Sequence, residues 1–196
     1  MISPFNNAGL FLVQSIFDLY IFILMIRIVL QWVDADFHNP IFAAIAKITT
    51  PPLRPLRRII PMLHGIDLAA IVLLLALEII KIALLVWLQA DAVPRFPGLV
   101  VLSFAELLNQ LINIFFYAII ALAVLSWLNP LVHSPLIEVL FRLTEPLMRP
   151  VRRVIPLIGG LDISPIPVLI ILKLLAIVIV QPLMTIGMAL AMSTGT

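Results

Sequence analysis

Two short proline-rich segments each carry three arginines whose spacing suits phosphate binding. The segments are PLRPLRRIIP (52–61) and LMRPVRRVIP (147–156), and in each the arginines are spaced i, i+3, i+4. One turn of helix would place the three guanidinium groups on one face. A guanidinium group stays charged and offers a fork of donors that matches phosphate, so the expected ligand is an anionic lipid headgroup or a cytoplasmic-side partner. The candidate residues are Arg54, Arg57, Arg58, Arg149, Arg152 and Arg153.

The same arginines have a second interpretation, as a signal that fixes membrane topology. Eight of the twelve Lys and Arg residues lie in the two loops that contain these segments. By the positive-inside rule both basic loops are cytoplasmic, and both termini and the central linker lie on the periplasmic side. The two interpretations are compatible, because an arginine that sets topology also faces the anionic leaflet.

Ionisable residues inside the apolar runs form a second candidate site, an intramembrane charge pair. Glu78 and Lys173 are separated by 95 residues, and Lys81 lies one helical turn from Glu78. A charge in the hydrocarbon costs a few kcal/mol, so each needs a partner, a wet cavity or a route to the interface. Glu78 can pair with Lys173 or with Lys81, either as an ion or proton relay or as a structural pin between helices. The scarcity of polar lining favours the pin. Arg27 can extend towards the interface near Trp32.

Other polar groups are weaker candidates. A stripe at i, i+3, i+4, i+7 marks the third apolar run and would either line a small cavity or bond to another helix. Two symmetric histidines, His38 and His133, could ligate one haem iron, but no attachment motif accompanies them. The stripe consists of Glu106, Asn109, Gln110 and Asn113.

The two arginine segments belong to a longer internal repeat with one fixed offset of 95 residues. Register is kept without a gap over some forty positions, which indicates a tandem duplication. Matching pairs include Trp32 with Trp127, His38 with His133, Pro40 with Pro135, Thr49 with Thr144, Gly65 with Gly160, and Asp67 with Asp162.

Composition places the chain among integral membrane proteins. Hydrophobic residues make up 63% of 196 residues and charged residues 11%, far from the balance of soluble domains. The chain has no cysteine, which excludes disulfides, thiol catalysis and cysteine-ligated metals. No GxSxG, HExxH or glycine-rich phosphate loop is present, so we expect a protein that is not an enzyme and binds no metal or cofactor.

The expected fold is all-α, with four transmembrane helices over about 8–33, 68–88, 99–128 and 163–191. Each half reads as span, short interfacial helix, arginine turn and span, giving a first repeat (1–90), a linker (91–98) and a second repeat (99–196). The interfacial helix of the first repeat should open at Pro40 and close at Pro51. Asp67 and Asp162 are expected N-caps of the following spans. Because each unit crosses the membrane twice, a pseudo-twofold axis along the membrane normal should relate the repeats. Pro182 should kink or shorten the last span.

The residues that carry this pattern resemble a known family. The stretch from Gln31, QWVDADFHNPIFAAIAKITTPPLRPLRRIIPMLHGIDLAAI, and the stretch from Ser126, SWLNPLVHSPLIEVLFRLTEPLMRPVRRVIPLIGGLDISPI, are similar to the two signatures of the YggT (YlmG-like) family. The most specific part is TEPLxRPxRRxIPxxGGxD. The first repeat departs from it, with Thr50 in place of the Glu found at 145 and His64 in place of the glycine found at 159. The resemblance implies a bacterial inner-membrane or plastid protein.

The resemblance implies several roles without a defined biochemical activity. Family members are linked to hyperosmotic stress tolerance and potassium-related growth, to division and nucleoid distribution, and in plastids to cytochrome b6 haem assembly. The leading hypothesis is a non-enzymatic inner-membrane protein that supports envelope homeostasis by binding anionic lipid or a partner through its arginine turns. The alternatives are a small, oligomeric ion transporter or channel-like protein that uses Glu78 and Lys173, and a factor for haem assembly or cell division.

Overall fold

The computed structural model describes residues 4–33, 39–63, 67–90, 94–128, 134–155 and 162–192. Four stretches are long and apolar enough to cross a membrane: Asn7–Trp32, Leu68–Gln89, Phe96–Leu125 and Pro165–Met192. The expected all-α membrane fold with four spans is confirmed. The elements are α1 (Pro4–Trp32), α2 (Pro40–Leu56), α3 (Leu68–Ala90), α4 (Phe96–Leu128), α5 (Pro135–Arg152), α6 (Pro165–Leu175), the π-helical turn η1 (Ala176–Val180) and α7 (Gln181–Met192).

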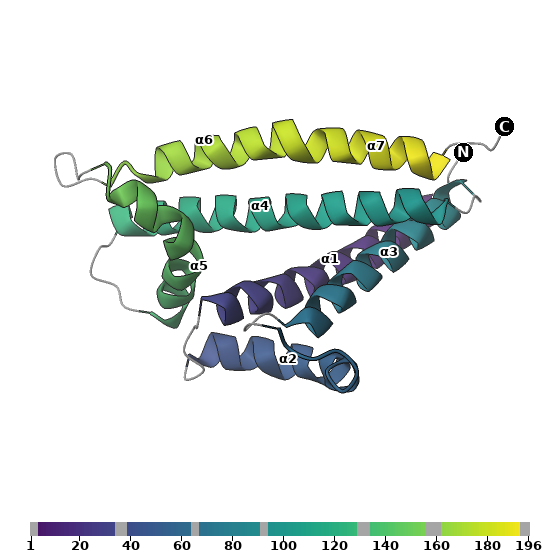
Figure 1. The fold of residues 1–196 in the computed structure, drawn as a ribbon, viewed down its shortest axis with the longest axis horizontal. Helices are drawn as coiled ribbons and strands as arrows, with labels where there is room; N and C mark the ends of the chain where they lie inside the picture. The colour runs from purple at the N-terminus through teal and green to yellow at the C-terminus, as the bar shows by residue number, and fades with distance from the viewer. Residues whose placement is uncertain are drawn as a thin grey trace.

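The four long helical rods place both amphipathic helices at one end of the molecule. In Figure 1, α4 crosses the centre, α6 and α7 run along one side of it, and α1 and α3 lie on the other. Helices α2 and α5 lie at the end opposite the two termini and the α3–α4 connection (Figure 1). The two arginine segments begin in the last turns of α2 and α5, so they share that end and face the same side of a membrane.

The two repeats do not pack as a complete twofold pair. A full twofold would bring α6 and α7 against α1 in the way that α3 packs against α4. Helix α3 contacts both α1 and α4, whereas among the described helices α6 and α7 contact neither α1 nor α3. The expected pseudo-twofold packing is therefore incomplete, and one side of α1 lacks the helix that the symmetry would place there.

Two glycines allow α4 and α7 to approach closely. A Cβ added to Gly98 would lie 2.1 Å from the backbone nitrogen of Ala191, and one added to Gly187 would lie 2.9 Å from the backbone nitrogen of Leu102. Small residues at such contacts let helix backbones come together in lipid, where dispersion forces replace the hydrophobic effect. Close backbone contact therefore contributes to the packing of the two spans of the second repeat.

Pro182 distorts the last span without ending it. The span continues from Pro165 to Met192, and the turn before the proline is π-helical, with the N–H of Gln181 bonding to the carbonyl of Ala176. Proline cannot donate a backbone hydrogen bond and its ring crowds the preceding turn. A wider π-helical turn accommodates both effects, so the expected distortion takes this local form.

The amphipathic helices are longer than expected, because prolines lie inside them. Helix α2 runs through Pro51, Pro52 and Pro55, so the expectation that Pro51 closes the helix is wrong. Side chains reinforce the turn before the prolines: Thr49 Oγ1 donates to the carbonyl of Ile45 at 2.7 Å, and Thr50 Oγ1 donates to that of Ala46 at 2.5 Å. Helix α5 likewise contains Pro146 and Pro150.

The side chains at the start of α2 and α5 join the two repeats. Asn39 and Ser134, which are repeat equivalents, occupy the N-cap positions and accept hydrogen bonds from the N–H groups of Ile41 and Ile137. Asn39 Nδ2 also donates to the carbonyl of Pro135 at 3.0 Å and to Glu138 Oε2 at 3.1 Å. The two amphipathic helices therefore form one connected platform at this end of the molecule.

Candidate functional site

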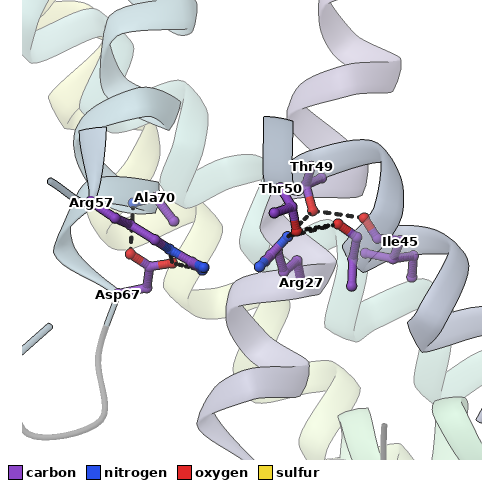
Figure 2. A network of polar contacts seen from close by, with 8 residues as sticks. Arg27, Ile45, Thr49, Thr50, Arg57, Asp67 and Ala70 are labelled. Atoms are coloured by element: carbon purple, nitrogen blue, oxygen red, sulfur yellow. Dashed lines mark hydrogen bonds and ion pairs between the residues drawn. The ribbon is translucent and has the colours of Figure 1, made fainter. Parts of the chain in front are cut away.

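Arg57 forms an ion pair with Asp67 that ties the first arginine turn to the start of α3. Arg57 Nη2 lies 2.5 Å from Asp67 Oδ2, and Arg57 Nε donates to the same oxygen at 3.0 Å (Figure 2). Asp67 Oδ1 accepts the N–H of Ala70 at 3.3 Å. Asp67 immediately precedes α3 and therefore has the geometry of an N-cap, while its other oxygen holds the arginine.

The same ion pair recurs at the equivalent positions of the second repeat. Arg152 Nε donates to Asp162 Oδ2 at 3.0 Å, and Arg152 Nη1 donates to Glu145 Oε2 at 3.2 Å. The N-cap of α6 is Ser164, so the expectation that Asp162 caps this span is wrong by two residues. Asp162 instead accepts the N–H of Ser164 at 3.0 Å, because α6 begins later than α3 does.

Asp162 is stabilised in its charged form by these contacts. Burial alone would raise the pKa of the Asp162 carboxyl, but hydrogen bonds from the hydroxyl and N–H of Ser164 and from Arg152 outweigh burial and hold the pKa below its usual value. The carboxylate therefore remains charged and paired under ordinary conditions. We call the two pairs, Arg57–Asp67 and Arg152–Asp162, the arginine latches.

The latches divide the six candidate arginines into two groups. Arg57 and Arg152 are partly buried and bonded within the chain, with side-chain exposures of 29% and 32%. The other four are exposed at the end of the molecule where α2 and α5 lie, and none of them makes an ion pair with another described residue: Arg54, Arg58, Arg149 and Arg153. Within the described part of the chain, the side-chain donors of these four arginines are therefore available to an external anion.

A hollow of about 340 Å³ lies beside one of the exposed arginines. Its lining combines cationic, acidic and aromatic groups from α1 and α5. Tryptophan favours the level of the lipid headgroups. Arg142 and Arg149, two helical turns apart on α5, line the same hollow. The lining residues are Trp32, Val33, Arg142, Glu145, Pro146 and Arg149.

Arg27 was expected to extend to the interface, and the structure corrects this. It is 7% exposed, and its Nη1 donates to the carbonyl of Ala46 at 3.1 Å and to Thr50 Oγ1 at 3.0 Å; it also donates to Thr49 Oγ1 (Figure 2). The buried guanidinium joins α1 to α2 just before the prolines. Its partner Thr50 replaces the glutamate of the second repeat, which is the sequence signal that could have revealed the contact.

The intramembrane charges form a triad that does not include Lys173. Lys81 Nζ lies 2.6 Å from Glu78 Oε1 and 2.7 Å from Asp18 Oδ1, and Glu78 is fully buried. Lys173 is exposed on α6. Of the two partners expected for Glu78, the structure therefore shows Lys81, and the pairing with Lys173 is wrong: α4 lies between α3 and α6, which do not contact each other. Asp18 was not assigned to the charge cluster from sequence, although its position in an apolar run is a signal.

A groove of about 510 Å³ lies next to the triad between α1, α4 and α5. Three positions of α1 line it, and so do their repeat equivalents on α4. The equivalent pairs are Asp18 and Asn113, Phe22 and Tyr117, and Ile26 and Ala121. Gln110 adds a further amide to the lining. The groove therefore follows the boundary between the repeats, and part of the expected polar stripe lines it.

Some sequence-based candidates lie outside the described residues. These are the histidine pair His38 and His133, and the bend glycines Gly65 and Gly160. Among the residues that the structure describes, no group of three or more His, Cys, Asp or Glu side chains is arranged to hold a metal ion. The haem interpretation therefore stays a sequence-based hypothesis.

The repeated unit of span, amphipathic helix, arginine latch and span defines a class of all-α multi-pass membrane protein built by duplication. The sequence profile of the CCB3/YggT family matches residues 6–88 and again 101–183, and the chain belongs to this family.

Similar proteins occur in several bacteria. An uncharacterized protein of Pseudomonas aeruginosa is 36% identical over 91% of both chains. A protein of Vibrio alginolyticus, encoded in the proC 3' region, is 38% identical over 81% of this chain and 85% of its own. The YggT protein of Escherichia coli is 32% identical over 92% of this chain and 94% of its own. No solved structure gives a significant match.

Proposed function

We propose that the protein is a non-enzymatic membrane component whose two arginine turns bind anionic lipid headgroups at the cytoplasmic face of the inner membrane. One observation carries the proposal. The chain neutralises Arg57 and Arg152 with Asp67 and Asp162, yet leaves the neighbouring arginines of both turns exposed without an ion-pair partner among the described residues. The internal pairs fix the turn, and the exposed arginines bind phosphate.

The position of the exposed arginines supports lipid as the ligand. They lie in or directly after the last turns of α2 and α5, the amphipathic helices at one end of the four spans (Figure 1), which is where the headgroups of one leaflet would lie. Each basic side chain near an anionic leaflet contributes about 1 kcal/mol of attraction. The hollow lined by Trp32, Arg142 and Arg149 could hold one phosphate between two guanidinium groups, with the indole at headgroup level. Its acidic wall, Glu145, is paired with Arg152.

The experiment compares two double variants that remove the same number of charges from the same turns. Arg54→Gln/Arg149→Gln removes one exposed arginine from each repeat, and Arg57→Gln/Arg152→Gln removes the latch arginines. Native mass spectrometry of the delipidated protein measures its preference for phosphatidylglycerol over phosphatidylcholine. We expect the first variant to lower the preference at each turn by about fivefold, in line with about 1 kcal/mol for the one arginine removed there. We expect the second to lower stability and keep the preference.

The proposal fails if the first variant keeps the preference for the anionic lipid, or if both variants lose it equally. The physiological part has a separate test. Support of the envelope under osmotic stress predicts that a variant with all four exposed arginines changed to glutamine does not restore growth of an osmotically sensitive deletion strain, although it inserts at normal level. Full restoration would contradict this role.

Ion or proton transfer is a second candidate function, favoured by the triad. Asp18 and Glu78 bring two carboxylates to one lysine, and Glu78 Oε2 is buried without a hydrogen-bond donor among the described residues. An excess carboxylate in the hydrocarbon needs a proton or a cation. Reconstituted protein should then conduct protons across liposomes, and Glu78→Gln should abolish the flux. Absence of flux from the unaltered protein under an imposed gradient would exclude this function.

A further inference from the structure

Lys173 is a cation on the outer surface of a membrane span. It is exposed, and none of the described acids lies within ion-pair distance of it. It lies eight residues from the start of α6, about 12 Å along the helix axis. The same face of α6 carries Ile166 and Ile170, both exposed, at the spacing that aligns residues on one side of a helix. A lone ammonium on such a face is costly unless something anionic covers it.

The groove between α1 and α4 has acceptor groups that lack a cationic partner. Asp18 is 39% exposed at its side chain and uses only Oδ1 to accept from Lys81. Neither Gln110 nor Asn113 makes a side-chain hydrogen bond within the described part of the chain, although both line the groove. The two carboxylates of the triad exceed its one lysine by one negative charge. The groove therefore offers Asp18 Oδ2 and the side-chain amides of Gln110 and Asn113 as free acceptors, inside otherwise apolar walls.

Repeat equivalence relates the two surfaces. Lys173 is the repeat equivalent of Glu78, and Glu78 shares Lys81 with Asp18. Both repeats cross the membrane in the same direction, so Lys173 and Glu78 occupy corresponding positions along α6 and α3. The α6 face of one copy therefore approaches the groove of another with the same orientation in the membrane.

The packing of the repeats shows why a second copy is the occupant. Helix α3 packs against α4, and the equivalent contact of α6 with α1 does not occur among the described helices of one chain. A second copy can supply it, with its α6 against α1 of the first. The acyl chains of lipids carry no cation that would match Asp18. A second copy of the protein presents Lys173 on α6, which is the helix that the symmetry would place against α1.

We propose that the protein self-associates head to tail, with the α6 face of one copy docked in the α1–α4 groove of the next and Lys173 paired with Asp18. Such a contact joins different surfaces of the two copies, so it leaves one groove and one α6 face free at the ends of a dimer and extends to a ring or a row. Lys173 then balances the excess charge of the neighbouring triad, and its three donors can also serve Gln110 or Asn113.

The absence of cysteine permits a direct test by disulfide cross-linking in native membranes. Ile170→Cys places a thiol on the α6 face and Phe22→Cys places one in the groove. We expect a cross-linked dimer only when the two variants are co-expressed. The pair Ile170→Cys with Val72→Cys is the control, because Val72 is exposed on α3 and lies outside the groove. Cross-linking of Ile170→Cys with itself, or equal yield from the control pair, would overturn head-to-tail docking.

A second measurement tests the charge pair itself. Single-molecule photobleaching in liposomes counts the copies in each complex. Lys173→Met should reduce the dimer fraction by about fivefold or more, and Lys173→Arg should keep it. Asn113→Leu, which removes no internal bond, should also reduce it. An unaltered protein that is monomeric at every density would overturn the proposal, and would indicate that Lys173 extends to the headgroups instead. The variant with all four exposed arginines changed to glutamine should associate as the unaltered protein does, which would show that self-association does not depend on lipid binding by the arginine turns.

Discussion

Arg57 and Asp67, ten residues apart, form an ion pair across the bend between α2 and α3, with the closest N···O distance at 2.5 Å. The same spacing and chemistry recur at Arg152 and Asp162. Two independent turns therefore use one arginine of three in the same way. This arrangement fixes the direction in which the remaining arginines project from the membrane, and it predicts how the turns respond to substitution.

The first prediction is that breaking the first latch destabilises the protein. Asp67 is almost fully buried, so Arg57→Gln leaves its carboxylate without a charged donor. We expect a loss of about 1–3 kcal/mol, measured as a lower thermal midpoint in detergent. Arg57→Gln/Asp67→Asn should cost less than the sum of the two single changes. Strict additivity in this double-mutant cycle would contradict a direct interaction.

The second prediction concerns the pH dependence of the second latch. The folded-state pKa of Asp162 is lowered, so its contribution to stability is complete above the ordinary aspartate pKa of about 4 and is lost as pH falls through the lowered value. Asp162→Asn should remove this contribution, so the thermal midpoints of variant and unaltered protein should converge as pH falls below about 4. A difference that stays constant down to pH 2 would contradict the prediction.

The third prediction tests close packing between α4 and α7. Gly98→Val should strongly destabilise the second repeat, because even a Cβ at this position would lie 2.1 Å from Ala191 N. The matched control is Gly9→Val, since a Cβ at Gly9 meets nothing within 4 Å. Protease sensitivity and thermal midpoint should change for the first variant and stay near the original value for the second. Equal loss of stability in the two variants would show that the difference in helix propensity between glycine and valine, and not contact with α7, causes the effect of Gly98→Val.

The fourth prediction separates the members of the intramembrane triad. Lys81→Met leaves Asp18 and the fully buried Glu78 without their shared cation, so it should reduce folded protein more than Glu78→Gln, which keeps the Lys81–Asp18 pair. The double variant Lys81→Met/Glu78→Gln should recover part of the loss. The yield of monodisperse protein extracted from the membrane measures the severity of the defect in each of the three variants. A more severe defect in Glu78→Gln would indicate that Glu78 has a role beyond pairing.

The repeat and the four spans could both be predicted from the sequence. Each of these features is local: hydrophobic length determines a span, and a fixed offset of 95 residues aligns the two units. The end of α2 could not be predicted so well. Pro51 suggested a stop, but Pro51 and Pro52 continue the helix, and hydroxyl donors at Thr49 and Thr50 and the buried Arg27 bond to the turn before them.

The partners of the charged groups were decided by tertiary structure. Repeat equivalence places Glu78 and Lys173 at one depth, but depth does not determine which way a side chain points around its helix. The order of the packed helices puts α4 between α3 and α6. Their rotation brings Lys81 into ion pairs with Glu78 and Asp18 and leaves Lys173 exposed. Sequence by itself determined what each segment is and how far it reaches across the membrane. Only packing decided which charges meet, because an ion pair depends on distances of a few ångströms between helices that the chain joins through long connections.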